Sequence, residues 1–324
     1  MGDTILVSEA FVEANGDRLR AAAPDLGILA IDPTDETGPD ADVIADATIA
    51  FLSNDVWPDG AAGFFRALTR ASELAWLHVM FAGVDHRVFQ QLMRRGVSLT
   101  TSQGASAPAI AETVVLYLTA LSRGLPEHIR RQPSGPWEWH RWRPLAGRRV
   151  AVVGYGPVGR RIEQALRWLG MDVTCVRRAV RGDETCPVRT LDELPAVCAE
   201  SDVVVLALPL TDDTAGILSR PIIEALAADC LVVNVGRGAL VDQPALTEAL
   251  RDGRLAGAGL DVFETEPLDP EDPLWVLPNV IITPHNAGAS TDAPERVTDL
   301  FFENLRRWLA GDELLNRATP AAAD

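Results

Sequence analysis

Val150-Ala-Val-Val-Gly154-Tyr155-Gly156-Pro157-Val158-Gly159-Arg160 is the stretch that decides the fold. Its apolar start predicts a buried strand, the pattern G-x-G-x-x-G predicts a tight turn, and Arg161–Leu169 has the pattern of a helix. In such a unit Gly154 permits the turn, Gly156 lets a pyrophosphate approach the backbone, and Gly159 lets the helix pack closely on the strand. Free N–H groups at the start of the helix then bind phosphate. A glycine-rich turn without a ligand is the alternative, and the flanking strands and helix disfavour it.

Short apolar runs continue beyond this turn and alternate with helical patterns. Alternating strands and helices predict a parallel sheet that is covered by helices on both faces. The run of strands is long enough for a complete dinucleotide-binding sheet. The six expected strands are Val150–Gly154, Asp172–Val176, Val203–Leu208, Leu231–Val235, Gly257–Val262 and Val280–Ile282.

The N-terminal part of the chain shows the same alternation, with helical patterns at Gly63–Glu73 and Val88–Arg94. The chain has 324 residues, which at roughly 100–200 residues per domain suggests two domains. The sequence therefore predicts an α/β protein of two Rossmann-like or flavodoxin-like domains, each with a parallel sheet. The strands expected in the first domain are Thr4–Val7, Leu26–Ile31, Ala47–Leu52, Leu77–Phe81 and Val97–Thr101.

Three further segments lie outside this alternation. A long apolar helix is expected at Ala107–Ser122. Gln132–Pro144 is rich in Pro and Trp and has no clear period, so we interpret it as a loop or an arm. The amphipathic helix expected at Ala293–Ala310 has no strand after it, and we expect this helix to cross back to the first domain.

The composition excludes several classes of function. A net charge of −17 argues against a nucleic-acid partner, because phosphate neutralisation needs a basic face. All 29 basic residues are arginine, which rules out a lysine Schiff base and a Walker-type lysine. No signal peptide, no membrane span of about 18 apolar residues and no metal-ligand spacing is expected. Cys175, Cys186, Cys198 and Cys230 lie far apart in the sequence, so free thiols in a reducing cytoplasm are expected.

The end of the strand at Asp172–Val176 bears on the choice of cofactor. NAD enzymes usually have Asp or Glu there, which binds the ribose 2′-hydroxyl. This chain has Arg177 and Arg178 instead, and guanidinium groups form forked, charge-assisted bonds to phosphate. We therefore expect NADP(H) to be preferred over NAD(H), which stays possible. Two solvated surface arginines are the alternative.

Three polar segments each follow an expected strand of the second domain: NVGRGALVD from 234, GLDVFETEP from 259 and TPHNAG from 283. Open α/β sheets bind ligands at the carboxyl ends of their strands. Together the segments contain Arg237, carboxylates and His285. An arginine can fork onto a substrate carboxylate, a histidine can protonate a carbonyl oxygen, and a nearby carboxylate favours the protonated histidine. With a hydride donor, these groups can support the reduction of a 2-keto acid. The alternatives are an arginine that only caps a turn and a histidine with a structural role.

These motifs make the chain similar to the D-isomer-specific 2-hydroxyacid dehydrogenase family, in particular to its glyoxylate/hydroxypyruvate reductase-like members. The resemblance covers nearly the whole chain. The matching segments are GYGPVG, LPLTDDTAGIL, NVGRGALVD, GLDVFETEP and TPHNAG, with weaker matches at FAGVD (Phe81–Asp85) and AIAET (Ala109–Thr113).

The resemblance implies a role for each group. Arg237 would bind the substrate and His285 would be the acid and base. Glu266, directly before the proline, would be the partner of His285, with Glu264 as the alternative. Backbone groups at Ala82, Gly83 and Val84 would bind the substrate carboxylate.

The resemblance also implies the cofactor contacts. Asp261 would hold the nicotinamide carboxamide, and no metal is required. The full implied set is Gly154, Tyr155, Gly156, Pro157, Val158, Gly159, Arg177, Arg178, Leu208, Pro209, Thr214, Val235, Gly236, Asp261 and Ala287.

A discontinuous arrangement of domains is implied as well. Residues 1–101 and 290–324 would form the substrate-binding domain, residues 102–289 the NAD(P)-binding Rossmann domain, and the active site would lie in the cleft between them. Family members are commonly homodimers that associate partly through an extended arm. Trp137–Trp142 would be that arm, because exposed aromatic residues are frequent interface anchors. Packing of this segment against its own domain is the alternative.

The substrate can be narrowed by two departures from other branches of the family. Met80 and Phe81 stand where a phosphoglycerate-type member carries arginine, and Glu266 stands where a formate dehydrogenase carries glutamine. Glyoxylate and hydroxypyruvate remain, and larger acids such as phenylpyruvate stay open. The expected function is hydride transfer between NADP(H) and a small 2-keto acid. An NAD(P)-sensing, corepressor-like binding protein of the same fold is the alternative.

Overall fold

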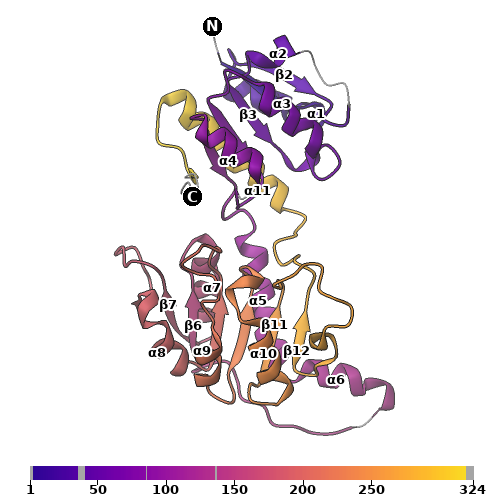
Figure 1. The fold of residues 1–324 in the computed structure, drawn as a ribbon, viewed down its shortest axis with the longest axis vertical. Coiled ribbons are helices and arrows are strands. Elements are labelled where there is room, and N and C mark those ends of the chain that lie inside the picture. Colours follow the sequence, from indigo (N-terminus) through magenta and orange to yellow (C-terminus); the bar gives the residue numbers. More distant parts are fainter. Residues whose placement is uncertain (1–2, 36–40, 85, 136, 319–324) are drawn as a thin grey trace. The chain divides into compact units, whose positions relative to one another are not determined.

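The computed structural model describes residues 3–35, 41–84, 86–135 and 137–318. The chain divides into two compact units, which we call unit 1 (Met1–Ala105 with Thr291–Asp324) and unit 2 (Ser106–Ser290). Each unit is built around a parallel sheet with helices on its faces (Figure 1). The expected fold class, two parallel-sheet α/β domains, is confirmed.

The sheet of unit 1 has five strands in the order β2-β1-β3-β4-β5, and every neighbouring pair is parallel. The strands are short and begin or end within a few residues of the expected positions. They are β1 (Thr4–Ser8), β2 (Gly27–Ile31), β3 (Ile49–Leu52), β4 (Trp76–Val79) and β5 (Ser98–Thr101).

Side chains of alternate residues in these strands point to opposite faces of the sheet and pack in two separate apolar clusters. Leu6 packs with Phe64 and Leu68 on one face, whereas Ile5 packs with Phe11 and Phe301 on the other. Both faces are covered, so the strands read as continuous apolar runs. The helices of unit 1 are α1 (Glu9–Ala22), α2 (Ala41–Ala45), α3 (Ala61–Arg70), α4 (Arg87–Arg94) and α11 (Ala293–Ala310), with a 3₁₀ turn at Asn54–Val56.

The last helix, α11, belongs to unit 1 although it follows unit 2 in the sequence. Its Phe301 ring stacks on Phe51 of β3 at a centroid distance of 4.2 Å. Arg18 of α1 donates to Asp299 of α11 at 2.7 Å, which joins the two helices at the surface. Aromatic packing thus holds the end of the chain on the sheet formed by its beginning.

The sheet of unit 2 has seven parallel strands in the order β12-β11-β10-β9-β6-β7-β8. The expectation of six strands was wrong by one, because the two-residue strand β8 adds an edge beside β7. Two residues are too few to give a periodic signal. The strands are β6 (Arg149–Val153), β7 (Asp172–Val176), β8 (Val188–Arg189), β9 (Val203–Leu206), β10 (Leu231–Asn234), β11 (Gly257–Leu260) and β12 (Val280–Ile282).

Helices cover both faces of this sheet too (Figure 1). Tyr117 and Ile162 lie in one apolar cluster, and Leu246 and Ile223 lie in the other. None of the helices in the described part of the chain has the length and apolar character needed to cross a bilayer. The helices are α5 (Ala107–Ser122), α6 (Leu125–Arg131), α7 (Pro157–Trp168), α8 (Leu194–Ala199), α9 (Arg220–Ala225) and α10 (Gln243–Arg251), with 3₁₀ turns at Gln132–Ser134, Leu191–Glu193, Gly238–Leu240 and Pro273–Val276.

Candidate active site

The three polar segments lie side by side because their strands do. The strands β10, β11 and β12 are neighbours in the parallel sheet, so their carboxyl ends meet at one edge. Arg237 follows β10, Glu266 follows β11 and His285 follows β12. We call residues 234–242, 261–267 and 283–288 the three-loop cluster. The sheet order alone therefore gathers a guanidinium, a carboxylate and an imidazole.

His285 and Glu266 form a direct pair. The Nδ1 atom of His285 lies 2.7 Å from Oε2 of Glu266, and the other carboxylate oxygen accepts the Phe263 N–H at 3.0 Å. Glu264, the alternative partner, accepts the Gln243 N–H at 3.1 Å instead. The side chain of His285 is 49% exposed. Its Nδ1 is therefore engaged, and its Nε2 is the ring nitrogen left to meet another molecule.

Asp261 holds the backbone of the His285 loop. Its carboxylate accepts the N–H groups of Asn286 and Ala287 at 2.9–3.1 Å, and its carbonyl accepts the His285 N–H at 2.8 Å. His285 has a φ of +51°, an uncommon conformation for a residue with a Cβ. Surrounding bonds must hold such a backbone in place. Asp261 is only 2% exposed, so the observed role of its carboxylate lies within the loop, and the implied contact to a carboxamide stays a prediction.

A further residue, Tyr117 of α5, is linked to this loop by hydrogen bonds. Its hydroxyl is hydrogen-bonded to the Thr283 hydroxyl, which in turn donates to Asp261. A Cβ on Gly259 would lie 2.5 Å from the Tyr117 ring, so β11 can pack this closely against α5 only with glycine at this position. Burial raises the pKa of Tyr117 to about 12, and its hydroxyl stays protonated at neutral pH. The signal missed in the sequence was one tyrosine in a mostly apolar helix.

The Arg237 loop is fixed against the Glu266 loop by close packing. Asn234 donates to the Arg237 carbonyl and accepts the Gly236 N–H, both at 3.0 Å. A Cβ on Gly238 would lie 1.8 Å from the Phe263 carbonyl carbon, which no side chain can do. Arg237 is partly exposed, and within the described part of the chain its guanidinium donates to a single acceptor, the neighbouring Gly236 carbonyl at 2.7 Å. Its remaining donors are free to bind an anion.

The glycine-rich turn has the shape that a pyrophosphate needs. Gly154 has a φ of +106°, and a Cβ there would lie 2.6 Å from the Ala207 carbonyl oxygen. A Cβ on Gly159 would lie 1.9 Å from the Gly154 carbonyl oxygen, so α7 packs directly on the turn. Gly156 is the N-cap of α7 and no side chain caps the helix, which leaves its first N–H groups for a ligand.

The two arginines after β7 differ in their surroundings. Arg177 is 12% exposed, and its guanidinium donates to Asp183 at 3.0 Å and to Glu184 at 2.6 Å. Backbone N–H groups of the loop and Arg177 lower the pKa of Glu184 to about 2, so this carboxylate stays charged. Arg178 is 69% exposed and pairs at 2.9 Å with Asp213, which is exposed as well. Arg178 is thus the more accessible of the two to a phosphate.

The remaining predicted cofactor residues come from loops beside the turn. A Cβ on Gly236 would lie 2.9 Å from the Leu208 carbonyl oxygen, which brings the loops after β9 and β10 together. The Thr214 hydroxyl donates to the Pro209 carbonyl at 2.8 Å and accepts the Thr211 N–H at 2.7 Å, so it is used within its own loop. Val235 and Ala287 are buried in the apolar cluster that also contains Tyr155.

The predicted substrate loop belongs to unit 1. Ala82 is exposed, whereas Gly83 and Val84 are partly buried, and the Val84 carbonyl accepts from the Gln90 side chain at 3.0 Å. The preceding Phe81 meets the Trp57 ring edge to face at 5.1 Å. Asp85, the last residue of the FAGVD motif, lies outside the described residues.

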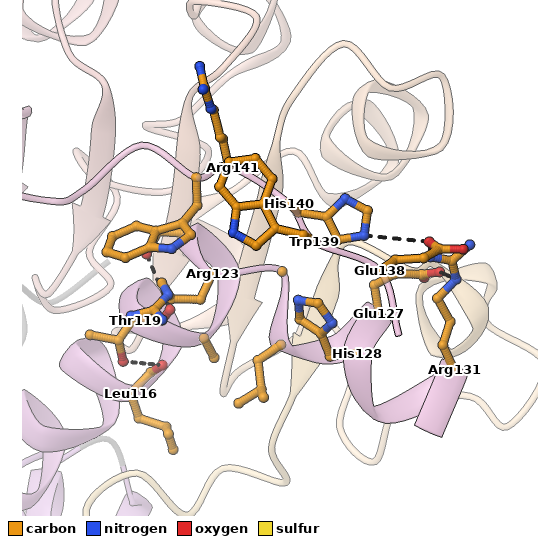
Figure 2. A pocket seen from close by; sticks show the side chains of 15 residues that line it. Leu116, Thr119, Arg123, Glu127, His128, Arg131, Glu138, Trp139, His140 and Arg141 are labelled. Carbon is orange, nitrogen blue, oxygen red and sulfur yellow. Dashed lines mark hydrogen bonds and ion pairs between the residues drawn. The ribbon is translucent and has the colours of Figure 1, made fainter. Parts of the chain in front are cut away.

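Sequence reasoning missed a cavity at the predicted arm. It measures about 950 Å³ and is lined by residues of α5, α6 and the segment 138–142 (Figure 2). Trp137 is 99% exposed, Trp139 and Trp142 are also exposed, and the Arg123 guanidinium lies over the Trp142 ring at 3.8 Å. The cavity shares no lining residue with the three-loop cluster. Pro136, within the predicted arm, lies outside the described residues.

Comparison with known proteins identifies the family. A family model, the NAD binding domain of D-isomer specific 2-hydroxyacid dehydrogenases, matches residues 115–287. This chain belongs to the D-isomer specific 2-hydroxyacid dehydrogenase family. It is therefore an NAD(P)-dependent oxidoreductase that transfers a hydride to or from a 2-hydroxyacid skeleton. The expectation of an enzyme is confirmed.

Relatives of this dehydrogenase match over most of their length. A glyoxylate/hydroxypyruvate reductase of Arabidopsis thaliana is 32% identical over 238 residues, 72% of this chain and 73% of that protein. A glyoxylate reductase of Korarchaeum cryptofilum is 31% identical over 297 residues, 86% of each chain. A family member from Xanthobacter autotrophicus, solved with NADPH and MES, has a TM-score of 0.79 at 30% identity and 98% coverage of both chains. A family member from Aeromonas salmonicida reaches a TM-score of 0.80 at 31% identity, over 99% of this chain and 100% of that one.

Proposed function

We propose that this dehydrogenase reduces a small 2-keto acid of the glyoxylate or hydroxypyruvate type with NADPH. The observation that carries the proposal is the His285–Glu266 pair at 2.7 Å, which joins the loops after β12 and β11; the loop of Arg237 follows β10, the next strand of the sheet. Relatives named glyoxylate reductase or glyoxylate/hydroxypyruvate reductase support the choice of substrate. A neutral Phe81 beside Trp57, in place of a phosphate-binding arginine, also fits a small uncharged substituent.

Each group of the three-loop cluster has a distinct part in this reaction. Arg237 binds the keto acid carboxylate through its free guanidinium donors. The nicotinamide, when bound, supplies the hydride that reaches the carbonyl carbon. His285 donates the Nε2 proton to the carbonyl oxygen, so the product is the neutral hydroxyl. Glu266 holds Nδ1 and balances the positive charge of the ring while it carries the extra proton.

The cofactor lies, in this proposal, along the carboxyl ends of the unit 2 strands. Its pyrophosphate meets Gly156 and the first turn of α7. Arg178 binds the 2′-phosphate, and Arg177 joins it once released from Asp183 and Glu184. The NADPH in the Xanthobacter autotrophicus structure and the NADP in a Sinorhizobium meliloti glyoxylate/hydroxypyruvate reductase (26% identity, TM-score 0.78) support this choice of cofactor. NADH is expected to serve as a weaker donor.

The two units divide the work in this proposal. Unit 1 contributes the backbone of Ala82–Val84 to binding of the substrate carboxylate, and unit 2 contributes Arg237 and the cofactor site. We also propose a cytoplasmic homodimer in which the exposed Trp137 and Trp139 are buried by the second copy. Sedimentation of the wild type against a Trp137→Ser/Trp139→Ser variant tests the dimer, which should dissociate in the variant.

A steady-state screen tests the substrate and the cofactor together. Glyoxylate, hydroxypyruvate, pyruvate and phenylpyruvate are each compared with NADPH and NADH. The highest kcat/KM is expected with glyoxylate or hydroxypyruvate, and NADPH should exceed NADH by about one to two orders of magnitude. A preference for phenylpyruvate would refute the substrate proposal, and equal values for the two cofactors would refute the role of the arginines.

A further inference from the structure

Two of the four cysteines meet in space although ten residues separate them. Cys175 is a buried residue of β7, and Cys186 is partly exposed just before β8. Their Sγ atoms lie 2.9 Å apart. The sequence predicted free thiols, because the four cysteines lie far apart along the chain and form no C-x-x-C motif, and it did not predict this contact.

The backbone holds this pair in place independently of the sulfur atoms. The strands β7 and β8 are parallel neighbours, with Cys175 beside Val188 in register. The Cys175 N–H donates to the Pro187 carbonyl at 2.9 Å, directly after Cys186. A disulfide has an S–S length of about 2.05 Å, so the two sulfurs need to approach by less than about 1 Å. The fold can therefore accept the bond with a small local adjustment.

The two thiols differ in their readiness to react. The hydrogen bond between the two sulfurs lowers the pKa of Cys186, and the same bond together with burial raises the pKa of Cys175. The thiolate is the reactive form, so Cys186, the more exposed of the two, is the attacking group. Cys175 lies behind it in contact, where a resolving thiol must be.

We propose that Cys175 and Cys186 form an oxidant-sensitive dithiol site that closes to a disulfide with oxidants of the peroxide class. The Cys186 thiolate attacks one peroxide oxygen, the O–O bond breaks, and Cys186 becomes a sulfenic acid while hydroxide leaves and takes up the proton. The Cys175 sulfur then attacks the Cys186 sulfur and displaces the sulfenic oxygen as water. Overall two thiols lose two electrons and two protons, and one hydrogen peroxide becomes two waters.

The loop enclosed by this disulfide carries the arginines of the proposed cofactor site. Asp183 and Glu184, which hold Arg177, directly precede Thr185 and Cys186. Thr185 also contacts the Tyr155 hydroxyl of the glycine-rich turn at 3.0 Å. Arg177 can turn toward a 2′-phosphate only if this part of the loop moves. A disulfide at Cys186 restrains that motion, so oxidation should weaken NADPH binding; this consequence rests on the proposed cofactor site.

The other two cysteines provide matched controls. Cys198 and Cys230 are both buried, and burial raises the pKa of each thiol to about 12. Neither has a sulfur partner among the described residues, and Cys230 contacts the Leu231 carbonyl. Both should remain reduced thiols under conditions that oxidise the pair.

Peptide mapping tests the site itself. The reduced full-length enzyme is treated with hydrogen peroxide, blocked with N-ethylmaleimide and digested with trypsin. Cleavage at Arg177, Arg178 and Arg181 places the two cysteines on separate peptides, 168–177 and 182–189. The expected product is these two peptides joined by one disulfide that dithiothreitol reverses. Alkylated Cys175 and Cys186 in the treated enzyme, or a disulfide to any other cysteine, would overturn the proposal.

Variants separate the chemistry from folding. Cys198→Ala should still form the disulfide. Cys175→Ser should stop at a Cys186 sulfenic acid that dimedone labels, and Cys186→Ser, at the more exposed position, should give neither product. Dimedone labelling at Cys175 in the Cys186→Ser variant, with none at Cys186 in Cys175→Ser, would contradict the assigned order.

Kinetics then test the consequence for the cofactor. Oxidation of the wild type should raise KM for NADPH by about three- to tenfold, the loss expected for one exposed charge-assisted bond, and should change KM for NADH less. Cys186→Ser should show no such change after the same treatment. A mapped disulfide with unchanged KM for NADPH would refute the coupling to Arg177 and leave the dithiol site standing. Equal KM values for the two cofactors before oxidation would instead count against the proposed cofactor site.

Discussion

The two units each place a histidine among parallel strands, and they give it opposite properties. In unit 1, His78 is fully buried on β4, with its ring nitrogens 2.7 Å from the Thr100 hydroxyl and 3.1 Å from the Ser102 hydroxyl. Burial lowers the pKa of His78 to about 3. In unit 2, His285 follows β12, is half exposed and faces the Glu266 carboxylate.

The difference shows what makes a histidine fit for proton transfer. Hydroxyl groups satisfy a neutral ring in either tautomer and add no charge to stabilise an imidazolium. A carboxylate stabilises the charged ring, and solvent access lets a second molecule reach the other nitrogen. His78 lies within a strand of its sheet and His285 in the loop after one, so the two positions differ in partner and in exposure, and these two properties decide the chemistry.

Replacing the exposed histidine should have the largest effect. His285→Gln removes the proposed proton donor and should lower kcat by about 10²–10⁴-fold, the usual contribution of general acid–base catalysis. Binding of NADPH, measured by fluorescence titration, should persist. His78→Gln is the matched control and should affect stability far more than kcat. Wild-type turnover in His285→Gln would end the proposed role of this residue.

Replacement of Glu266, the partner of His285, should have the second largest effect. Glu266→Gln keeps the shape and a hydrogen bond but removes the charge that balances the protonated ring. A charge-assisted bond contributes roughly 1.5–3 kcal/mol, so kcat should fall by about 10–100-fold. Glu264→Gln, two residues away and bonded to Gln243, should retain nearly full activity in the same assay. If the two variants lost activity equally, the 2.7 Å pair would not be the catalytic one.

The buried His78 should instead affect the pH dependence of the unfolding free energy. The folded state keeps His78 neutral down to about pH 3, whereas the unfolded chain takes up a proton below about pH 6.5. Its contribution to stability is therefore complete above pH 6.5 and is lost as the pH falls from there toward 3. Urea unfolding followed from pH 7.5 to 5 should show a loss of up to about 1.4 kcal/mol per pH unit from this group. The His78→Gln variant should have a shallower pH dependence, and an identical slope would contradict the assignment.

The smallest effect is expected below the His285 loop. Tyr117→Phe removes one hydroxyl from the chain that links α5 through Thr283 to Asp261. The unfolding free energy should fall by about 0.5–1.5 kcal/mol, the net value of one hydrogen bond, and kcat by less than about fivefold. Thr283→Val, which removes the bond to Asp261 as well, should cost more in both measurements. A larger loss in Tyr117→Phe than in Thr283→Val would show that the tyrosine acts independently of the threonine.

Patterns of several residues were predicted well from the sequence. Apolar runs gave the larger strands, and Asp172–Val176, Val280–Ile282, Ala107–Ser122 and Ala293–Ala310 have the predicted bounds. The G-x-G-x-x-G turn and the three polar segments follow strands, as expected. Local composition determines these features, so a single sequence is enough to detect them.

Features that depend on distant or short contacts were missed. The strand β8 has two residues and exists because it pairs with β7. The same strand pairing brings Cys175 and Cys186 into contact, and no known cysteine motif has the spacing that would predict this contact from the sequence. The sequence predicted Arg177 and Arg178 as ligands of a 2′-phosphate, but it did not show that Asp183 and Glu184 from the returning loop engage Arg177. Each of these features depends on contacts between segments that are apart in the sequence, and the hydrophobic periodicity of a single segment carries no information about such contacts.

The contact at Gly238 limits how this enzyme can be redesigned. A Cβ at position 238 would lie 1.8 Å from the Phe263 carbonyl carbon, so the Arg237 loop and the Glu266 loop are in direct contact and leave no space for a side chain there. An engineer who wants a bulkier substrate therefore gains no room by parting these loops, since a side chain large enough to separate them would displace both functional groups. Directed libraries should therefore leave these two loops of unit 2 untouched.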